Sequence, residues 1–145
     1  MSQPNTRPEL TVYLRSSTPF PARERQEEVI ERAERLADDE LIADLRVRHW
    51  EARVAVRNGD DAEAVATFEA LKERAGEMGH SIEPFFQEHE RGEIREIVFP
   101  VICIAVHVEE ELRRVFPCRD EEDAYSVWDC LTALETDGDL ADLDD

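Results

Sequence analysis

The chain has 145 residues, of which 36 are acidic and 17 are basic, so its formal net charge is -19 at pH 7. This length fits a single domain. The longest apolar run, residues 97–108, is too short to cross a membrane, which takes about 20 residues, and the N-terminus lacks the apolar stretch of a secretory signal peptide. We therefore expect a cytoplasmic protein.

The basic residues are almost all arginine, and Lys72 is the single lysine. So much like charge would push a compact state apart in dilute buffer. At molar salt, where the Debye length is about 3 Å, this repulsion is largely screened. Composition therefore predicts a protein adapted to concentrated salt, with a carboxylate surface that holds water and cations at high salt.

The first third of the chain favours a strand, a helix and a second strand. Residues 10–16 alternate as a half-buried strand does, and Pro21 suits the first turn of a helix. An apolar stripe then recurs at helical spacing, which predicts a helix over 22–39. Residues 43–50 alternate again, and Val54 and Val56 extend this second strand past a bend.

A second helix follows a turn at Asn58-Gly59. Asp60 with Glu63 fits a capping box, and apolar residues at helical spacing lead to Gly79, which can close the helix. Residues 82–87 indicate a short edge strand because Pro84 cannot donate a ladder hydrogen bond. The segment 89–93 is typical of a loop.

The C-terminal part favours a hairpin and a helix. Residues 101–108 are apolar on both faces, as in a central strand, and 112–116 can return antiparallel to it across Glu109–Glu111. Ser126 with Asp129 forms a capping box ahead of a third helix, with Gly138 past its end. The last ten residues carry five acids and no base, which predicts a mobile tail.

The resulting order is β-α-β-α-β-β-β-α. It predicts an α+β fold in which a mixed, partly antiparallel sheet of about five strands is layered with three helices. We expect one domain over residues 1–135 and an acidic flexible tail over 136–145.

Residues that carry enzyme chemistry form no recognisable pattern. The three cysteines form no CxxC pair, which indicates free thiols in or near the core, and the four histidines lack metal-ligand spacing. Phosphate-binding glycine loops and the nucleophile elbow of hydrolases are absent. We therefore expect no catalytic residue, no metal and no cofactor.

Arginines gather in the N-terminal part of the chain. Residues 1–57 hold 10 arginines against 11 acids, whereas residues 58–145 hold 7 bases against 25 acids. Forked guanidinium groups suit phosphate contacts, so our candidate nucleic-acid-binding residues are Arg15, Arg23, Arg25 and Arg32. The alternative is that the helical arginines pair with nearby glutamates along an exposed helix. Molar salt also weakens binding that depends on phosphate charge.

Several strings resemble a known family. VYLRSSTPFPARERQEEVIERAERL, the Trp50 region, EPFF at 83–86 and IVFPVICIAVHVEEELRRVFPC at 97–118 are similar to a haloarchaeal family of small proteins described as helix-turn-helix domain proteins. Relatives tend to have an Asp-Gly type turn where this chain has Glu109–Glu111. The resemblance implies a transcription-related role, with the first helix and the strands beside it as the contact surface.

A helix-turn-helix needs two helices joined by a short turn, whereas this sequence places a β-rich segment between the first two helices. We expect a small non-enzymatic protein, and the family resemblance implies a transcription-related, DNA-associated regulator. The alternative is an oligomerising or ligand-sensing module without a nucleic-acid partner. A homodimer is compatible with both, because an edge strand and several aromatic residues suit a self-complementary face.

Overall fold

The computed structural model describes residues 7–57 and 62–137. Its main sheet has four strands in the order β2-β1-β6-β7. β1 runs parallel to β2, while β6 is antiparallel to both of its neighbours, β1 and β7. These strands are β1 (Glu9–Arg15), β2 (Asp44–Trp50), β6 (Ile102–Val108) and β7 (Glu111–Phe116). The mixed sheet and the helices around it confirm the predicted α+β class.

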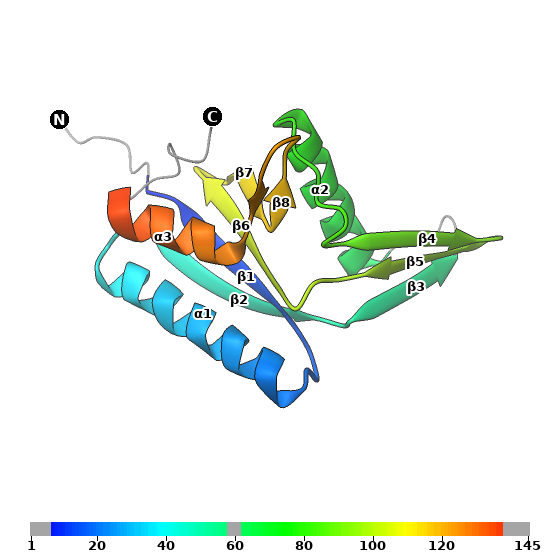
Figure 1. The fold of residues 1–145 in the computed structure, drawn as a ribbon, viewed down its shortest axis with the longest axis horizontal. Helices are drawn as coiled ribbons and strands as arrows, with labels where there is room; N and C mark the ends of the chain where they lie inside the picture. Colours follow the sequence, from blue (N-terminus) through cyan, green and yellow to red (C-terminus); the bar gives the residue numbers. More distant parts are fainter. Residues whose placement is uncertain (1–6, 58–61, 138–145) are drawn as a thin grey trace.

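Helices cover both faces of this sheet (Figure 1). α1 (Phe20–Asp38) connects the parallel strands β1 and β2 and packs beside α3 (Val127–Asp137) on one face, and α2 (Glu63–Glu77) lies on the other. The period of two along β1 sends Leu10, Val12 and Leu14 toward α1 and α3, whereas Tyr13 packs with the core on the α2 side. The sheet therefore separates two apolar clusters.

A smaller antiparallel sheet continues from the end of the main one. It contains β3 (Arg53–Arg57), β5 (Ile94–Val98) and β4 (Gln87–Arg91), in the order β3-β5-β4. β1 ends at Arg15, and beyond it the chain segments that follow β2 and precede β6 come together. There Phe99 donates its backbone N–H to the Ala52 carbonyl oxygen at 2.9 Å.

Side chains complete the hydrogen bonding where β1 ends. The amide nitrogen of the buried Gln26 donates to the carbonyl oxygens of Arg15 at 3.0 Å and Val101 at 2.9 Å. The Arg15 guanidinium donates to the carbonyl oxygen of Phe99. Because buried carbonyl groups need partners, these two side chains stabilise the point at which the two sheets diverge.

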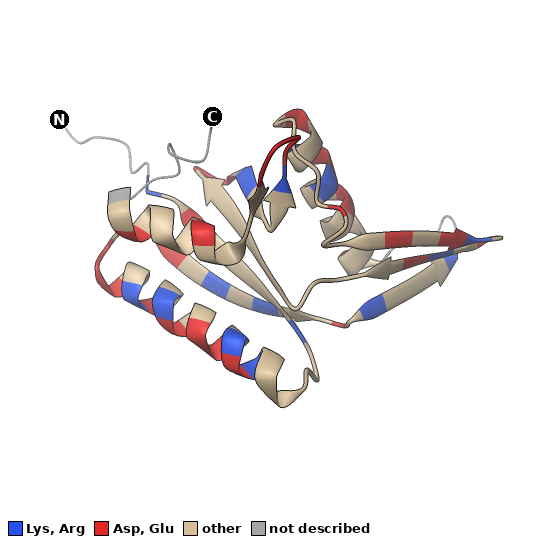
Figure 2. Ribbon diagram, in the orientation of Figure 1, with Lys and Arg blue, Asp and Glu red and all other residues tan. Residues whose placement is uncertain are grey.

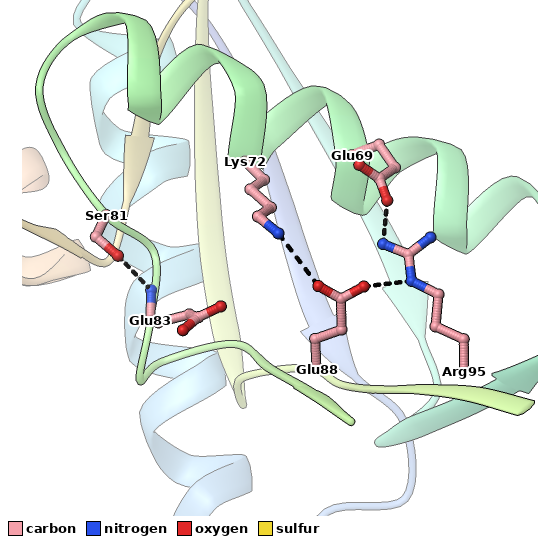
Figure 3. Close-up of polar contacts among 6 residues, drawn as sticks. All are labelled: Glu69, Lys72, Ser81, Glu83, Glu88 and Arg95. Carbon is pink, nitrogen blue, oxygen red and sulfur yellow. Dashed lines mark hydrogen bonds and ion pairs between the residues drawn. The ribbon is translucent and has the colours of Figure 1, made fainter. Parts of the chain in front are cut away.

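A chain of ion pairs attaches the small sheet to α2 (Figure 3). Lys72 Nζ lies 3.1 Å from Glu88 Oε1, and Glu88 also accepts a hydrogen bond from Arg95. Arg95 in turn pairs with Glu69 on α2. The same figure shows Ser81 Oγ accepting the backbone N–H of Glu83 at 3.1 Å, in the loop between α2 and β4.

The C-terminal part matches its predicted elements. β6 lies between β1 and β7, and β6 and β7 form the predicted hairpin. Two-residue strands, β8 (Cys118–Arg119) and β9 (Ala124–Tyr125), precede α3. The predicted capping box is present: Asp129 accepts the backbone N–H of Ser126 at 2.8 Å, and the Ser126 hydroxyl accepts that of Asp129 at 3.2 Å.

Local predictions between α2 and β5 were wrong. The expected edge strand over 82–87 is instead a turn region, and the expected loop over 89–93 forms part of the β4–β5 hairpin. Gly92, with φ of +60°, makes this hairpin turn possible because glycine adopts positive φ readily. Polar β4 pairs with β5, and its Glu88 forms ion pairs with Arg95 of β5 and Lys72 of α2, contacts that the polarity of residues 87–91 does not indicate.

Other predictions concern positions outside the described residues. These are the turn at Asn58-Gly59, the cap at Asp60, Gly138 and the tail from 138 onward. The residue that precedes α2 is Ala62, whose side chain makes no capping hydrogen bond. Residues 136 and 137 of the expected tail still belong to α3.

Candidate binding groove along the β2 edge

Two of the four candidate arginines make contacts within the fold. Arg15 is half-buried and bonds to the Phe99 carbonyl oxygen. Arg32 forms a forked pair with Glu135 of α3, with distances of 3.0 Å from Nε to Oε2 and 2.6 Å from Nη2 to Oε1. Its guanidinium carbon lies 5.7 Å from the ring centroid of Trp128. Arg15 therefore joins the end of β1 to the segment before β6, and Arg32 joins α1 to α3.

The other two candidates, Arg23 and Arg25, are exposed on the first turns of α1. Neither forms an ion pair with any residue in the described ranges. Positive and negative segments alternate along α1 (Figure 2). The structure thus leaves Arg23 and Arg25 available for contact, but it does not gather the four arginines into one patch.

A different feature stands out at β2, which forms one edge of the main sheet. An edge strand pairs on one side only, so backbone N–H and C=O groups on its other side face outward. Every residue from Arg46 to His49 is exposed, and the Val47 side chain remains 42% exposed. We call this free side of Asp44–Trp50 the β2 edge.

A groove of about 810 Å³ runs beside the β2 edge. Five consecutive residues, 47–51, line it on the strand side. Alternate strand residues point to opposite faces, so a hollow lined by five in a row reaches the edge of the sheet, while Tyr13 and α2 place its other side over the face that α2 covers. The full lining consists of Tyr13, Val47, Arg48, His49, Trp50, Glu51, Val54, Glu63, Ala64 and Thr67.

Aromatic rings form one wall of the groove. The rings of Tyr13 and Trp50 stack with centroids 4.6 Å apart and an interplanar angle of 12°. Trp50 is held from behind by Phe99, at 4.5 Å between centroids, and its indole N–H donates to the Pro100 carbonyl oxygen at 3.3 Å. These contacts fix the orientation of an apolar surface on which another side chain can pack.

Charged groups lie around this aromatic wall. Arg48 lies beside Tyr13 in the register of β1 and β2 and forms no ion pair with a described residue. The Nε atom of Arg46 lies 3.4 Å from Oδ2 of Asp44. Burial raises the pKa of the Tyr13 hydroxyl; Arg48 opposes this shift and Glu63 adds to it. The phenol is therefore neutral near pH 7, with a cation and a carboxylate nearby.

A second hollow of about 330 Å³ lies over the start of β1 and β2. Its lining includes Thr11, Arg46 and His107. Partial burial lowers the pKa of His107, Arg46 lowers it further, and Glu9 acts in the opposite direction. Arg46 thus borders a polar hollow that Glu9 and Glu110 also line, as well as the β2 edge.

The cysteines are free and buried, as the sequence indicated. Burial raises the pKa of the Cys118 thiol to about 11, and it raises the pKa of Cys103 and Cys130 as well. Thiolates are the reactive form, so these groups pack as small apolar side chains at neutral pH.

The groove was not identified from the sequence. It requires α2 to lie beside the end of β2, which depends on contacts between distant parts of the chain. The only sequence signal for it was the set of arginines and the tryptophan in residues 46–57. Figure 2 shows basic segments spaced along β2 and β3.

No two helices follow one another directly in the described chain, because α1 is followed by β2 and β3, and α2 by β4. Consistent with this order, α1 and α2 lie on opposite sides of the main sheet (Figure 1). A helix-turn-helix places two adjoining helices against each other. The described residues therefore contain no such pair.

The model of a family described as "Helix-turn-helix domain" matches residues 2–139. The chain belongs to this family, and the description suggests a DNA-associated regulatory role. No curated protein and no solved structure matches the chain. No helix among the described residues is long and apolar enough to cross a membrane.

Proposed function

We propose that this protein is a non-enzymatic, cytoplasmic regulator in a DNA-associated process and that it acts through a protein contact at the β2 edge. One observation carries the proposal: a seven-residue edge strand lies open beside a groove of about 810 Å³ with a stacked aromatic wall. Sheet edges and concave apolar surfaces with a few polar groups are common binding sites.

Direct reading of DNA by α1 is the less favoured route. The helix contains six acids and four arginines, and Arg32 is already paired with Glu135. Carboxylates beside the remaining arginines repel phosphate. In a helix-turn-helix, a short turn joins the recognition helix to the helix that crosses the DNA backbone. The helix packed beside α1 is α3, from the other end of the chain, and α2 lies across the sheet.

A second candidate function is direct contact with DNA through the arginines singled out in the sequence. The exposure of Arg23 and Arg25, without an ion pair among the described residues, favours it. On this alternative, Arg15 and Arg32 hold the end of β1 and the α1–α3 contact in place, and Arg23 and Arg25 touch phosphate.

A DNA titration separates the two candidates. Labelled genomic fragments are titrated with the protein at about 2 M KCl and again at lower salt, where phosphate contacts are strongest. The Arg23→Ala/Arg25→Ala double variant is compared with the control Arg35→Ala, which removes an exposed arginine near the other end of α1. We expect no sequence-selective shift and three matching curves. A selective shift that only the double variant abolishes would establish direct contact and refute our proposal.

A further inference from the structure

We propose that the groove binds an extended acidic segment of a partner protein, which adds to the main sheet as a strand beside β2. The inference rests on the proposed function, because it specifies the chemistry of the partner at the same surface. It combines three properties of the site: an open strand edge, a hollow that follows this edge, and arginines on the strand itself.

The shape of the groove suits an added strand. Neighbouring strands lie about 4.7–4.9 Å apart, so a partner strand must run directly alongside β2. The hollow does so along residues 47–51, and Glu63, Ala64 and Thr67 of α2 form its opposite wall. An extended segment between an edge strand and a helix obtains main-chain hydrogen bonds from the strand and side-chain contacts from both walls.

The charge of the β2 edge selects the partner. Arg46 and Arg48 are exposed and lie two residues apart, so both point to the face that carries Tyr13. Residues opposite each other on paired strands have Cβ atoms about 4.5–5.5 Å apart, where opposite charges attract and like charges repel. Acidic residues at alternate positions of the added strand would face these arginines.

The same rule disfavours a second copy of β2. A two-fold axis through an antiparallel pair centred on Val47 places Arg46 opposite Arg48 of the other copy. Centring the pair on Arg46 or Arg48 places that arginine opposite itself. In each of these three registers guanidinium groups face each other, which disfavours them for a second copy, whereas an acidic partner meets both arginines with opposite charge.

The residues that line the rest of the groove determine which side chains the partner segment would carry beyond its acids. An apolar or aromatic side chain would pack on the Tyr13–Trp50 wall, which already presents a fixed ring surface. Glu51 and Glu63 line the same groove, so the part of the segment near them would lack acids. The expected ligand therefore has alternating acids at one end and one large apolar residue toward the other.

The test uses a panel of labelled ten-residue peptides, with acids at alternate positions and one aromatic residue, titrated against the full chain by fluorescence anisotropy. Matched peptides replace every acid by lysine or carry N-methyl groups on alternate backbone nitrogens. We expect the acidic peptides to bind roughly tenfold more tightly than the lysine versions. N-methylation should weaken binding similarly, because it removes main-chain donors.

Two protein variants complete the design. Arg48→Glu should weaken acidic-peptide binding roughly tenfold, whereas Arg53→Glu, an exposed arginine of β3 outside the groove, should leave it unchanged. Equal binding of acidic and lysine peptides, no binding at about 1 mM by any acidic member, or no effect of Arg48→Glu would overturn the inference.

Two further outcomes would assign the groove to another occupant. A DNA oligonucleotide that binds with the same dependence on Arg48, or a dimer in sedimentation that Arg48→Glu alters, would each overturn the acidic-peptide assignment. Failure of the peptides without a selective DNA shift would reject the peptide chemistry alone. A selective DNA shift dependent on Arg23 and Arg25 would reject the proposed function itself.

Discussion

Glu88 is the residue on which the contact between α2 and the small sheet most depends. Its side chain is only 16% exposed and receives hydrogen bonds from both Lys72 and Arg95. Burial opposes ionisation of this carboxyl group, but the two cationic donors outweigh burial and lower the pKa of Glu88. A partly buried carboxylate with two charged donors contributes more than a surface ion pair does.

Glu88→Gln should lower the free energy of unfolding by about 1–2 kcal/mol, because it removes two charge-assisted hydrogen bonds and leaves Lys72 and Arg95 without their shared carboxylate. Urea unfolding at fixed KCl measures the change. Glu69→Gln is the matched control, since Glu69 is 50% exposed and its ion pair among residues 7–57 and 62–137 is with Arg95; it should change stability by less than about 0.5 kcal/mol. Equal losses in both variants would contradict the assignment.

The same residue predicts a pH dependence. Since the pKa of Glu88 is lowered in the folded state, its stabilising contribution is fully present above the ordinary glutamate pKa of about 4.3. It is lost as the pH falls through the lower pKa of the folded state. Acid unfolding of Glu88→Gln should therefore show a shallower loss of stability below about pH 4.3 than the unsubstituted protein. Parallel curves for the two proteins would show that protonation of Glu88 is not coupled to unfolding.

At the scale of elements, the turn that joins β6 and β7 has an unfavourable backbone conformation. Glu109 and Glu110 have φ values of 53° and 70°, a region that residues other than glycine and asparagine rarely adopt. Two-residue hairpin turns with positive φ at both positions favour Asn-Gly. The hairpin forms despite the turn residues because β6 is a central, largely buried strand and the second half of β7 is buried as well.

The double substitution Glu109→Asn/Glu110→Gly should raise the unfolding free energy by about 1–2 kcal/mol, since it relieves two strained backbone positions. Thermal unfolding at fixed salt measures it. Glu110→Gln, which removes the charge but keeps the strain, should give almost none of this gain. An equal gain from Glu110→Gln would attribute the effect to charge.

Periodicity predicted the helices and the strands of the main sheet because their apolar faces are local properties of the sequence. The capping box at Ser126 and Asp129 was predictable for the same reason. β4 was not, because QEHER is polar and its strand conformation depends on Lys72 and Arg95. The end of β1 likewise depends on Gln26 and Val101, which are far apart in the chain. The groove is lined by residues of β1, β2 and α2, which are far apart in the chain, so sequence patterns alone did not indicate it.

At the scale of the whole molecule, the large negative net charge makes the stability of the fold sensitive to salt concentration. A net charge of -19 creates repulsion that reaches about 10 Å at 0.1 M salt and only about 3 Å at 1 M. The described ion pairs use only a minority of the carboxylates. We therefore propose that the protein is adapted to concentrated salt.

The urea midpoint should rise steadily from about 0.1 M to about 2 M KCl, because screening relieves repulsion in the compact state. Glu27→Gln/Glu34→Gln, which neutralises two exposed carboxylates of α1, should raise the midpoint at low salt and change little at high salt. A protein that is most stable in low-salt buffer would contradict salt adaptation.

The partner surface that we propose is the β2 edge, with α1 and α2 on opposite faces of one sheet. Backbone amide NMR shifts, recorded with acidic peptide and separately with DNA, report which of these surfaces is contacted. We predict that the peptide shifts the amides of Asp44–Trp50, the Trp50 indole N–H and the first turns of α2, and that α1 is unaffected. Shifts concentrated on α1 around Arg23 and Arg25 when DNA is added, with β2 unchanged by peptide, would contradict the account.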